Sequence, residues 1–504
     1  MKLIALLLLA TTSAFAASPS INNDDSCDIK VGPAATLLLP YFEVDVNGTS
    51  GRTTLFTVTN VTRYPQIAHV TLWTDRAYPV LMFNLFLTGY DVQAINLADV
   101  LLRNTVATTS GTTAPGSLSA GSNANLRLPS GCDHTPGILP AEVMTGVRNA
   151  LTSGSVTGSP STTDPCGGVG SPHLNAIGYA TVDVVALCTT RSPTDPLYFT
   201  NDLLFDNVLI GDYQQLGAQP AGVSTGSYDA TGNTMVHIRA MPEGGAPGTN
   251  VATGLPYTFY DRYTPASTRT IDRRQPLPSV FAARYIQGGS SALLTNITIW
   301  REGVTDGTAG CSVSSNRNLP IAELVRFDEH ENSFAYGDGP QCSPITDCLE
   351  PKPTLTAAST TNTTFPAFPP LATQDAGGWL YLNLNNGGSS AYSVTASNVP
   401  RNTPPSTLAP DGSTTTIGPR PSQNWVTVTL FGHLNERITA EFDAATLGNG
   451  CSPSTFISTA TTIFPTTGAL PIAPAGGVFV CPPGTTLTNG STQQCTGTNI
   501  NPPP

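Results

Sequence analysis

LFTVTNVTRYPQIAHVTLWTD, residues Leu55–Asp75, is the stretch of sequence that decides the fold. Two runs rich in threonine, valine and large apolar residues, Thr53–Asn60 and Gln66–Thr74, lie on either side of a Tyr64-Pro65 turn. β-Branched and aromatic side chains favour strands because they pack well on a pleated surface. The stretch therefore predicts two antiparallel strands joined by a short connection.

Similar runs continue on both sides of this pair. Ala35–Phe42 precedes it and Val80–Leu87 follows it, with turn-forming residues such as Asn47-Gly48 between them. Closely spaced strands joined by short turns favour an antiparallel sandwich over β-α-β units. The later runs Ile177–Leu187, Asp202–Ile210 and Met235–Ala240 are expected to complete the same sheets.

A second set of strands is expected in the C-terminal half. Its members are Tyr257–Tyr260, Val280–Ile286, Ala292–Trp300, Glu323–Phe327 and Trp425–Leu430. An Asn386-Gly387 turn between Trp379–Asn385 and Ser390–Thr395 predicts a hairpin. The fold class is therefore all-β, with two immunoglobulin-like or jelly-roll-type antiparallel β-sandwich domains and long polar loops.

Composition shifts divide the chain. We expect a signal peptide over 1–16, a first sandwich over 17–245, a second over 246–450, and a Cys-containing Thr/Gly/Pro-rich tail over 451–504. The first sandwich carries an insertion at 104–175, and the second a Pro/Thr-rich loop at 350–374. One short helix is predicted between Pro140 and Gly154, with an apolar face of Val143, Met144, Val147, Ala150 and Leu151.

The N-terminus predicts export. Lys2 is followed by an apolar run and then by Ala14-Phe15-Ala16, which fits a Sec-type cleavage site. Leu55–Asp75 also resembles the strand–Asn–turn–strand pattern of bacterial immunoglobulin-like surface domains, a resemblance that implies a β-sandwich outside the cytoplasm. We therefore expect a secreted, extracellular or periplasmic protein.

Charge limits the partners. With 22 basic and 34 acidic residues the chain has a formal charge of −12, so it has no field that attracts nucleic acid. After the signal peptide no apolar stretch reaches the roughly 18 residues of a membrane-spanning helix. We expect neither nucleic acid nor a membrane span, and glycans or other surface proteins as partners.

The ten cysteines predict disulfides, because an even number in an exported protein is typical of oxidised pairs. Short separations favour Cys342–Cys348 and Cys481–Cys495. Cys132 and Cys166 lie close to His134 and His173, so they form either a third disulfide or, less favoured, a zinc site.

The densest aromatic cluster is the candidate ligand site. Aromatic faces beside a carboxylate and a guanidinium can stack on sugar rings and bind their hydroxyls. The candidate residues are Tyr257, Tyr260, Asp261, Arg262 and Tyr263. The competing interpretation is an aromatic strand that packs in the core.

Two acidic stretches are candidate cation sites. Asp45 and Asn47 begin a sequence like that of a calcium loop, and Asp328, Glu329 and Glu331 surround a histidine. A hairpin turn and a solvated loop explain the same residues. We expect no cofactor, with Ca²⁺ as the alternative.

No convincing catalytic group emerges. Gly222–Gly226 matches G-x-S-x-G, but its flanks form neither the strand nor the helix that a nucleophile elbow needs. We therefore expect a non-enzymatic protein with a structural, adhesive or glycan-binding role. The alternative is a secreted hydrolase that acts on polysaccharide or peptide.

Overall fold

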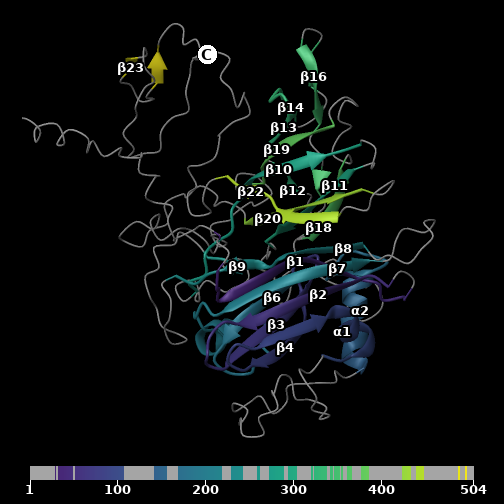
Figure 1. Ribbon diagram of the computed structural model, residues 1–504, viewed down its shortest axis with the longest axis vertical. Coiled ribbons are helices and arrows are strands. Elements are labelled where there is room, and N and C mark those ends of the chain that lie inside the picture. The colour runs from purple at the N-terminus through teal and green to yellow at the C-terminus, as the bar shows by residue number, and fades with distance from the viewer. Residues whose placement is uncertain are drawn as a thin grey trace, which may run out of the picture.

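In the computed structural model, the two halves of the chain form separate groups of sheets (Figure 1). The described residues are 29, 32–48, 51–106, 141–155, 169–217, 229–241, 258–260, 272–288, 293–302, 319–321, 323–337, 341–343, 346–351, 354–355, 360–365, 376–384, 423–432, 439–447, 486–488 and 494–496. The predicted boundary near residue 245 and the signal peptide lie outside them.

Two antiparallel sheets make up the first half, which we call the N-terminal sheet pair. One sheet has five strands in the order β4-β3-β6-β1-β9, and the other has four in the order β5-β2-β7-β8. Their bounds are β1 Thr36–Val44, β2 Thr53–Asn60, β3 Gln66–Thr74, β4 Pro79–Leu87, β5 Val92–Asn96, β6 Ala176–Val185, β7 Leu209–Gly217, β8 Asp229–Thr234 and β9 Val236–Ile238.

A hydrophobic cluster lies between these two sheets. Leu37, Leu39, Val70 and Val182 from the five-stranded sheet pack in one cluster with Phe56, Val58 and Tyr213 from the four-stranded sheet. Two helices, α1 Leu97–Arg103 and α2 Ala141–Thr152, add their apolar sides to the same cluster and lie next to each other (Figure 1). A one-turn π-helix, η1, spans Tyr198–Asp202.

The second half forms the C-terminal sheet pair. A seven-stranded sheet has the order β15-β16-β14-β13-β19-β10-β22, and a four-stranded sheet has the order β18-β11-β20-β21. Their bounds are β10 Val280–Ile286, β11 Leu294–Arg301, β13 Glu323–Asp328, β14 Ser333–Gly337, β15 Gln341–Ser343, β16 Thr346–Pro351, β18 Thr360–Phe365, β19 Gly377–Asn383, β20 Asn424–Phe431, β21 Thr439–Asp443 and β22 Ala445–Thr446. Two further pairs are β12 Leu319–Pro320 with β17 Thr354–Leu355, and β23 Thr486–Thr488 with β24 Gln494–Thr496.

The described chain is thus mostly β, with several antiparallel sheets, as predicted; β14 and β16 pair in parallel. Three predictions are corrected. Asp202–Ile210 is not a strand, because η1 ends at Asp202 and β7 starts at Leu209. Thr258–Tyr260 forms no strand. The polar loop 350–374 contains the strand β18, which pairs with β11.

The first strand of the predicted hairpin corresponds to β19. β19 is a central strand and pairs with β10 on one edge and β13 on the other. Ser390–Thr395 lies outside the described residues. The predicted helix is present as α2, with Met144, Val147, Ala150 and Leu151 buried, but Val143 is exposed. α1 was not predicted.

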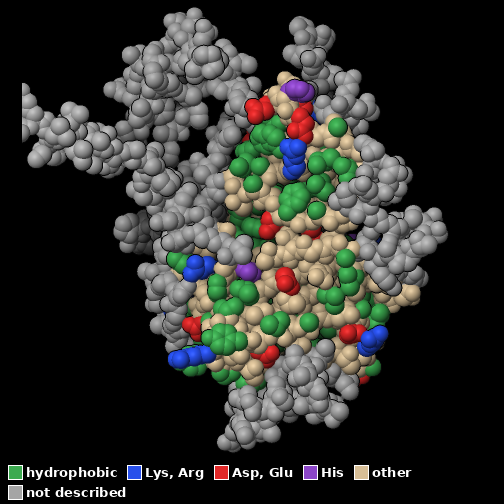
Figure 2. Space-filling model, in the orientation of Figure 1, with side chains coloured by type: hydrophobic (Ala, Val, Ile, Leu, Met, Phe, Trp, Pro, Cys, Tyr) green, Lys and Arg blue, Asp and Glu red, His purple; other side chains and the backbone are tan. Residues whose placement is uncertain are grey.

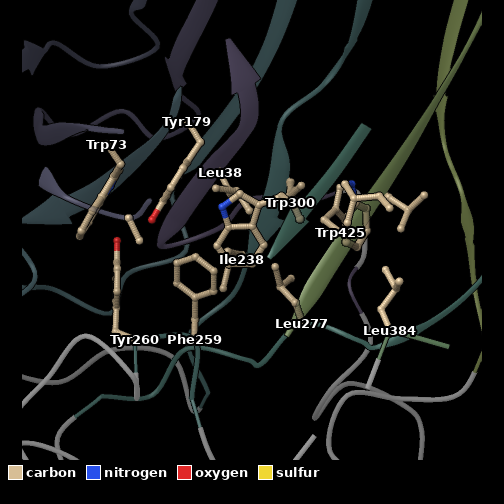
Figure 3. Packing of buried hydrophobic residues seen from close by; sticks show 14 of the residues in the cluster. Leu38, Trp73, Tyr179, Ile238, Phe259, Tyr260, Leu277, Trp300, Leu384 and Trp425 are labelled. Carbon is tan, nitrogen blue, oxygen red and sulfur yellow. The ribbon is translucent and has the colours of Figure 1, made fainter. Parts of the chain in front are cut away.

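One core connects the two sheet pairs. The outer face of the five-stranded sheet packs in a single cluster with residues of β10, β11, β19 and β20. The rings of Trp73 and Tyr179 stack with centroids 5.7 Å apart, and Tyr179 meets Trp300 of β11 edge to face at 5.8 Å. Figure 3 shows Phe259 and Tyr260 beside these rings and Trp425 beyond them.

Candidate functional site

A row of buried polar side chains crosses the outer face of the five-stranded sheet. Cross-strand partners place Asn84, His69, Asp183 and Thr36 side by side on β4, β3, β6 and β1. All four are buried. The His69 ring nitrogen Nδ1 lies 2.9 Å from Asn84 Oδ1, and burial lowers the pKa of this histidine.

Asp183 is the centre of this row. Its Oδ2 accepts hydrogen bonds of 2.8 Å from the hydroxyls of both Tyr198 and Tyr260. Its Oδ1 accepts from Thr36 Oγ1 and lies 3.4 Å from Arg274 Nη2, in a fully buried ion pair. Burial raises the pKa of both tyrosines well above the usual value. Because these side chains have no exposed surface, the network joins segments of the core and offers no group to a ligand.

These contacts bear on the predicted ligand site. Tyr260 is fully buried, its hydroxyl donates to Asp183, and its ring contacts Phe199 and Phe259. The structure therefore places Tyr260 in the core, as the competing interpretation of the aromatic cluster expected. Tyr257, Asp261, Arg262 and Tyr263 lie outside the described residues.

The residues of the predicted calcium loop close a turn. Asp45 is buried, and its two carboxylate oxygens accept from the backbone N–H groups of Asn47 at 3.0 Å and Gly51 at 3.1 Å. The Asn47 side chain donates instead to the carbonyl of Leu174. Local turn bonding thus explains Asp45 at this position.

The acidic side chains at the end of β13 and just after it also bond to groups of the protein itself. Asp328 accepts from Asn332 Nδ2 at 2.7 Å and from two backbone N–H groups, and the Asn332 bond is the main cause of its lowered pKa. Glu329 is half exposed and pairs with Arg284 at 2.6 Å, while Glu331 is exposed with a positive φ of 64°. Within the described residues, no three His, Cys, Asp or Glu side chains gather as metal ligands.

Cys188 is disulfide-bonded. Cys342 and Cys348 lie on the paired strands β15 and β16, in which Gln341 faces Leu349 and Ser343 faces Thr346. The Cys342–Cys348 bridge stays a prediction. Cys132, Cys166 and Cys481 are outside the described residues, and so is the side chain of Cys495.

A second acidic group was not predicted. Glu441 and Asp443 lie on β21, which packs against β8 of the N-terminal sheet pair. Asp443 Oδ1 accepts from Trp425 Nε1 at 2.9 Å and from Asn233 Nδ2 at 3.1 Å, and Glu441 accepts from the Tyr213 hydroxyl. Burial raises the pKa of both carboxyls, that of Asp443 to about 6.

The most exposed aromatic group of the described structure lies where two turns meet. The turn between β2 and β3 carries Arg63 and Tyr64, and the turn between β4 and β5 carries Tyr90. Tyr64 is 58% exposed and Tyr90 is 70% exposed. We call Arg63, Tyr64 and Tyr90 the tyrosine tip.

The Asn60 side chain bonds to both turns and holds them together. It is fully buried, and its Nδ2 donates to the carbonyl of Tyr64 at 2.7 Å and to that of Thr88 at 2.9 Å. Its Oδ1 accepts from the backbone N–H and the hydroxyl of Thr62. The Tyr90 N–H also donates to the carbonyl of Thr62 at 2.8 Å. The backbone of the tip is therefore fixed before any ligand binds.

The contact between the turns is close. A Cβ on Gly89 would lie 2.3 Å from the carbonyl oxygen of Arg63, so only glycine fits there. The next residue, Tyr90, has a φ of 59°, a left-handed conformation that is unfavourable for a bulky side chain. Backbone strain of this kind collects at binding sites, where the surroundings hold it in place.

Arg63 completes the chemistry of the tip. Its guanidinium carbon lies 4.7 Å from the centroid of the Tyr64 ring, and its Nη2 donates to the Tyr64 hydroxyl at 2.5 Å. Tyrosine and arginine are enriched among residues that dominate binding energy. The sequence showed Tyr64-Pro65 only as a turn signal, because its approach to Tyr90 depends on contacts between two separate turns.

No family of known proteins and no curated protein matches this chain. Among the described residues, no helix has the length and apolar character that crossing a membrane requires.

Proposed function

We propose that this chain is a secreted or cell-surface, non-enzymatic protein that binds glycans through the tyrosine tip. The observation that carries the proposal is the exposure of two tyrosine rings on turns whose backbone Asn60 fixes. A preformed site loses little conformational entropy when a ligand binds.

The chemistry of the tip suits sugars. A pyranose ring has an apolar C–H face that can stack on tyrosine, and its hydroxyls accept hydrogen bonds from a guanidinium. Arg63 lies beside Tyr64 and is itself exposed, so both kinds of group reach solvent at the same place. On the face drawn in Figure 2, acidic, basic and histidine side chains form small separate groups among hydrophobic and other side chains.

The sheet pairs support the rest of the proposal. Each consists of two sheets whose strands are antiparallel except for the β14–β16 pair, which fits an immunoglobulin-like or jelly-roll sandwich. The resemblance of Leu55–Asp75 to bacterial surface domains and the predicted signal peptide favour an extracellular or periplasmic location.

A glycan array probed with the purified mature protein tests the function. Wild type should bind a subset of glycans without releasing product, and Tyr64→Ala with Tyr90→Ala should weaken retention at least about tenfold. Leu174→Ala, at a side chain that is 86% exposed elsewhere, is the matched control and should bind as wild type does. Retention that survives both tyrosine changes, or a wild type that retains no glycan, contradicts the proposal.

A second candidate is a secreted hydrolase, and the specific observation for it is the acidic pair on β21. A carboxyl with a pKa of about 6 beside another carboxylate is a pattern that active sites use for general acid catalysis. Product release on the array that Asp443→Asn abolishes would favour the hydrolase over the binding protein.

A further inference from the structure

Sheet edges are the parts of this fold open to another chain. Within the described residues, β8 packs against β21, and the edge of β9 is continued by residues around Arg274, which bridges to Ala240. The Asn84 side chain of β4 exchanges hydrogen bonds with the backbone of Thr189. No described strand pairs with the outer edge of β5.

The register shows which backbone groups of β5 face outward. Asn60 N–H donates to the carbonyl of Asp91 at 2.9 Å, so this is a hydrogen-bonded pair of the β2–β5 ladder. Hydrogen-bonded and non-hydrogen-bonded pairs alternate along antiparallel strands. The N–H and C=O groups of Gln93 and Ile95 therefore point toward β2, and those of Val92 and Ala94 point away from the sheet.

The outward carbonyl of Ala94 has one partner already, because Gln93 Nε2 donates to it at 3.1 Å. A carbonyl oxygen has two lone pairs, so it can accept a second bond. Within the described residues, the Ala94 N–H donates to no backbone carbonyl.

The side chains of β5 also suit strand addition. Its sequence, VQAIN, contains no charge and no proline, and its register with β2 runs without a bulge. Val92 is 50% exposed, Ala94 is exposed, and Tyr90 precedes them at 70% exposed. Proteins normally protect open edges with lysine, proline or bulges, and β5 has none of these.

We propose that β5 pairs antiparallel with β5 of a second copy, around a two-fold axis at Ala94. A two-fold interface uses the same patch on both copies, and β5 satisfies this because Val92 of one copy then faces Asn96 of the other. The ladder pairs Val92 with Asn96, Gln93 with Ile95 and Ala94 with Ala94 of the second copy, so it contains no acidic residue. Two copies that each carry a charge of −12 repel, and the uncharged edge is where they can approach most closely.

The backbone bonds explain the specificity of the pairing, while Val92 supplies apolar area. An interface of one short strand pair is small, so we expect a weak dimer with a Kd on the order of micromolar.

Sedimentation equilibrium of the mature wild-type protein should show a monomer that becomes a dimer as concentration rises through the micromolar range. Ala94→Pro removes the outward N–H without touching the ladder to β2, and edge strands tolerate proline in this orientation. This variant should keep the thermal midpoint of the wild type and stay largely monomeric, with the dimer Kd raised at least about tenfold. Val92→Lys replaces apolar area at the same edge with a solvated charge, and it gives the same result if Ala94→Pro fails to fold.

Two variants serve as matched controls. Ala94→Val keeps the N–H, and Gln214→Lys adds a positive charge at an exposed position in the middle of the same sheet. Both should dimerise as wild type does. A wild type that stays monomeric, an assembly larger than a dimer, or a dimer unaffected by Ala94→Pro and Val92→Lys overturns the proposal. The glycan array tests the tyrosine tip separately, because Ala94→Pro leaves Tyr64 and Arg63 in place.

Discussion

Asn60 determines the geometry of the tyrosine tip although it never reaches the surface. Its side chain and backbone satisfy groups in both turns. The strand–Asn–turn–strand pattern marks an asparagine at this position, but it does not show which groups the side chain bonds. Its position before Val61-Thr62 fits a turn, which the sequence did predict. Its role in holding a second turn depends on the return of the chain 28 residues later, which no local pattern records.

We predict that Asn60→Ala destabilises the protein by about 2–4 kcal/mol, because the carbonyls of Tyr64 and Thr88 lose their donor in a buried place. Urea unfolding followed by circular dichroism measures this change. Glycan retention should also fall, although both tyrosines remain. Asn47→Ala, which removes a single exposed bond to the Leu174 carbonyl, should cost less than about 1 kcal/mol. Equal losses in the two variants would contradict the assigned role of Asn60.

At the scale of elements, the sequence predicted strands best where the apolar run was long. Thr53–Asn60, Gln66–Thr74 and Val280–Ile286 have the predicted bounds. β5 and β8 were missed because VQAIN and DATGNT lack a strong apolar pattern and exist through pairing with β2 and β7. The β18 strand TTNTTF was read as a polar loop for the same reason.

β21 gives a prediction about pH. The pKa of Asp443 in the folded protein is about 6, above its ordinary value of 3.8, so the folded state holds more protons between these values. The free energy of unfolding therefore falls as pH rises from about 4 to about 6 and stays low above that. The raised pKa of Glu441 acts in the same direction.

Asp443→Asn keeps an oxygen that accepts from Trp425 and Asn233 but removes the charge. We expect it to stabilise the protein at pH 7.5 by up to about 3 kcal/mol and to change little at pH 4. Thermal unfolding across this pH range checks both values. Asp212→Asn, at an exposed position on β7, controls for the loss of one negative charge. A stability gain in Asp443→Asn that is the same at both pH values would rule out titration of Asp443 as its cause.

At the scale of the whole molecule, the two sheet pairs share a core through Trp73, Tyr179 and Trp300. Alternation along Gln66–Thr74 places Val70 and Leu72 on one face and His69, Thr71 and Trp73 on the second. Both faces are in fact buried, because the C-terminal half packs on the second face. A sequence pattern reports how apolar a face is, and it does not report that a second set of sheets covers it.

The Asp183–Arg274 pair tests this shared core. Asp183→Asn replaces the carboxylate that pairs with the buried Arg274 by a neutral amide. It should therefore destabilise the protein by about 3–5 kcal/mol. Because the sheet pairs share one cluster, hydrogen exchange should speed up together in peptides from β6 and from β11.

Asp99→Asn is the matched control, because Asp99 pairs with Arg103 at the surface and its loss should cost less than about 1 kcal/mol. Faster exchange confined to β6, with β11 unchanged, would show that the sheet pairs unfold independently. Joint acceleration means that the cluster around Trp300 transmits the loss, so a ligand at the tyrosine tip would stabilise both halves of the chain.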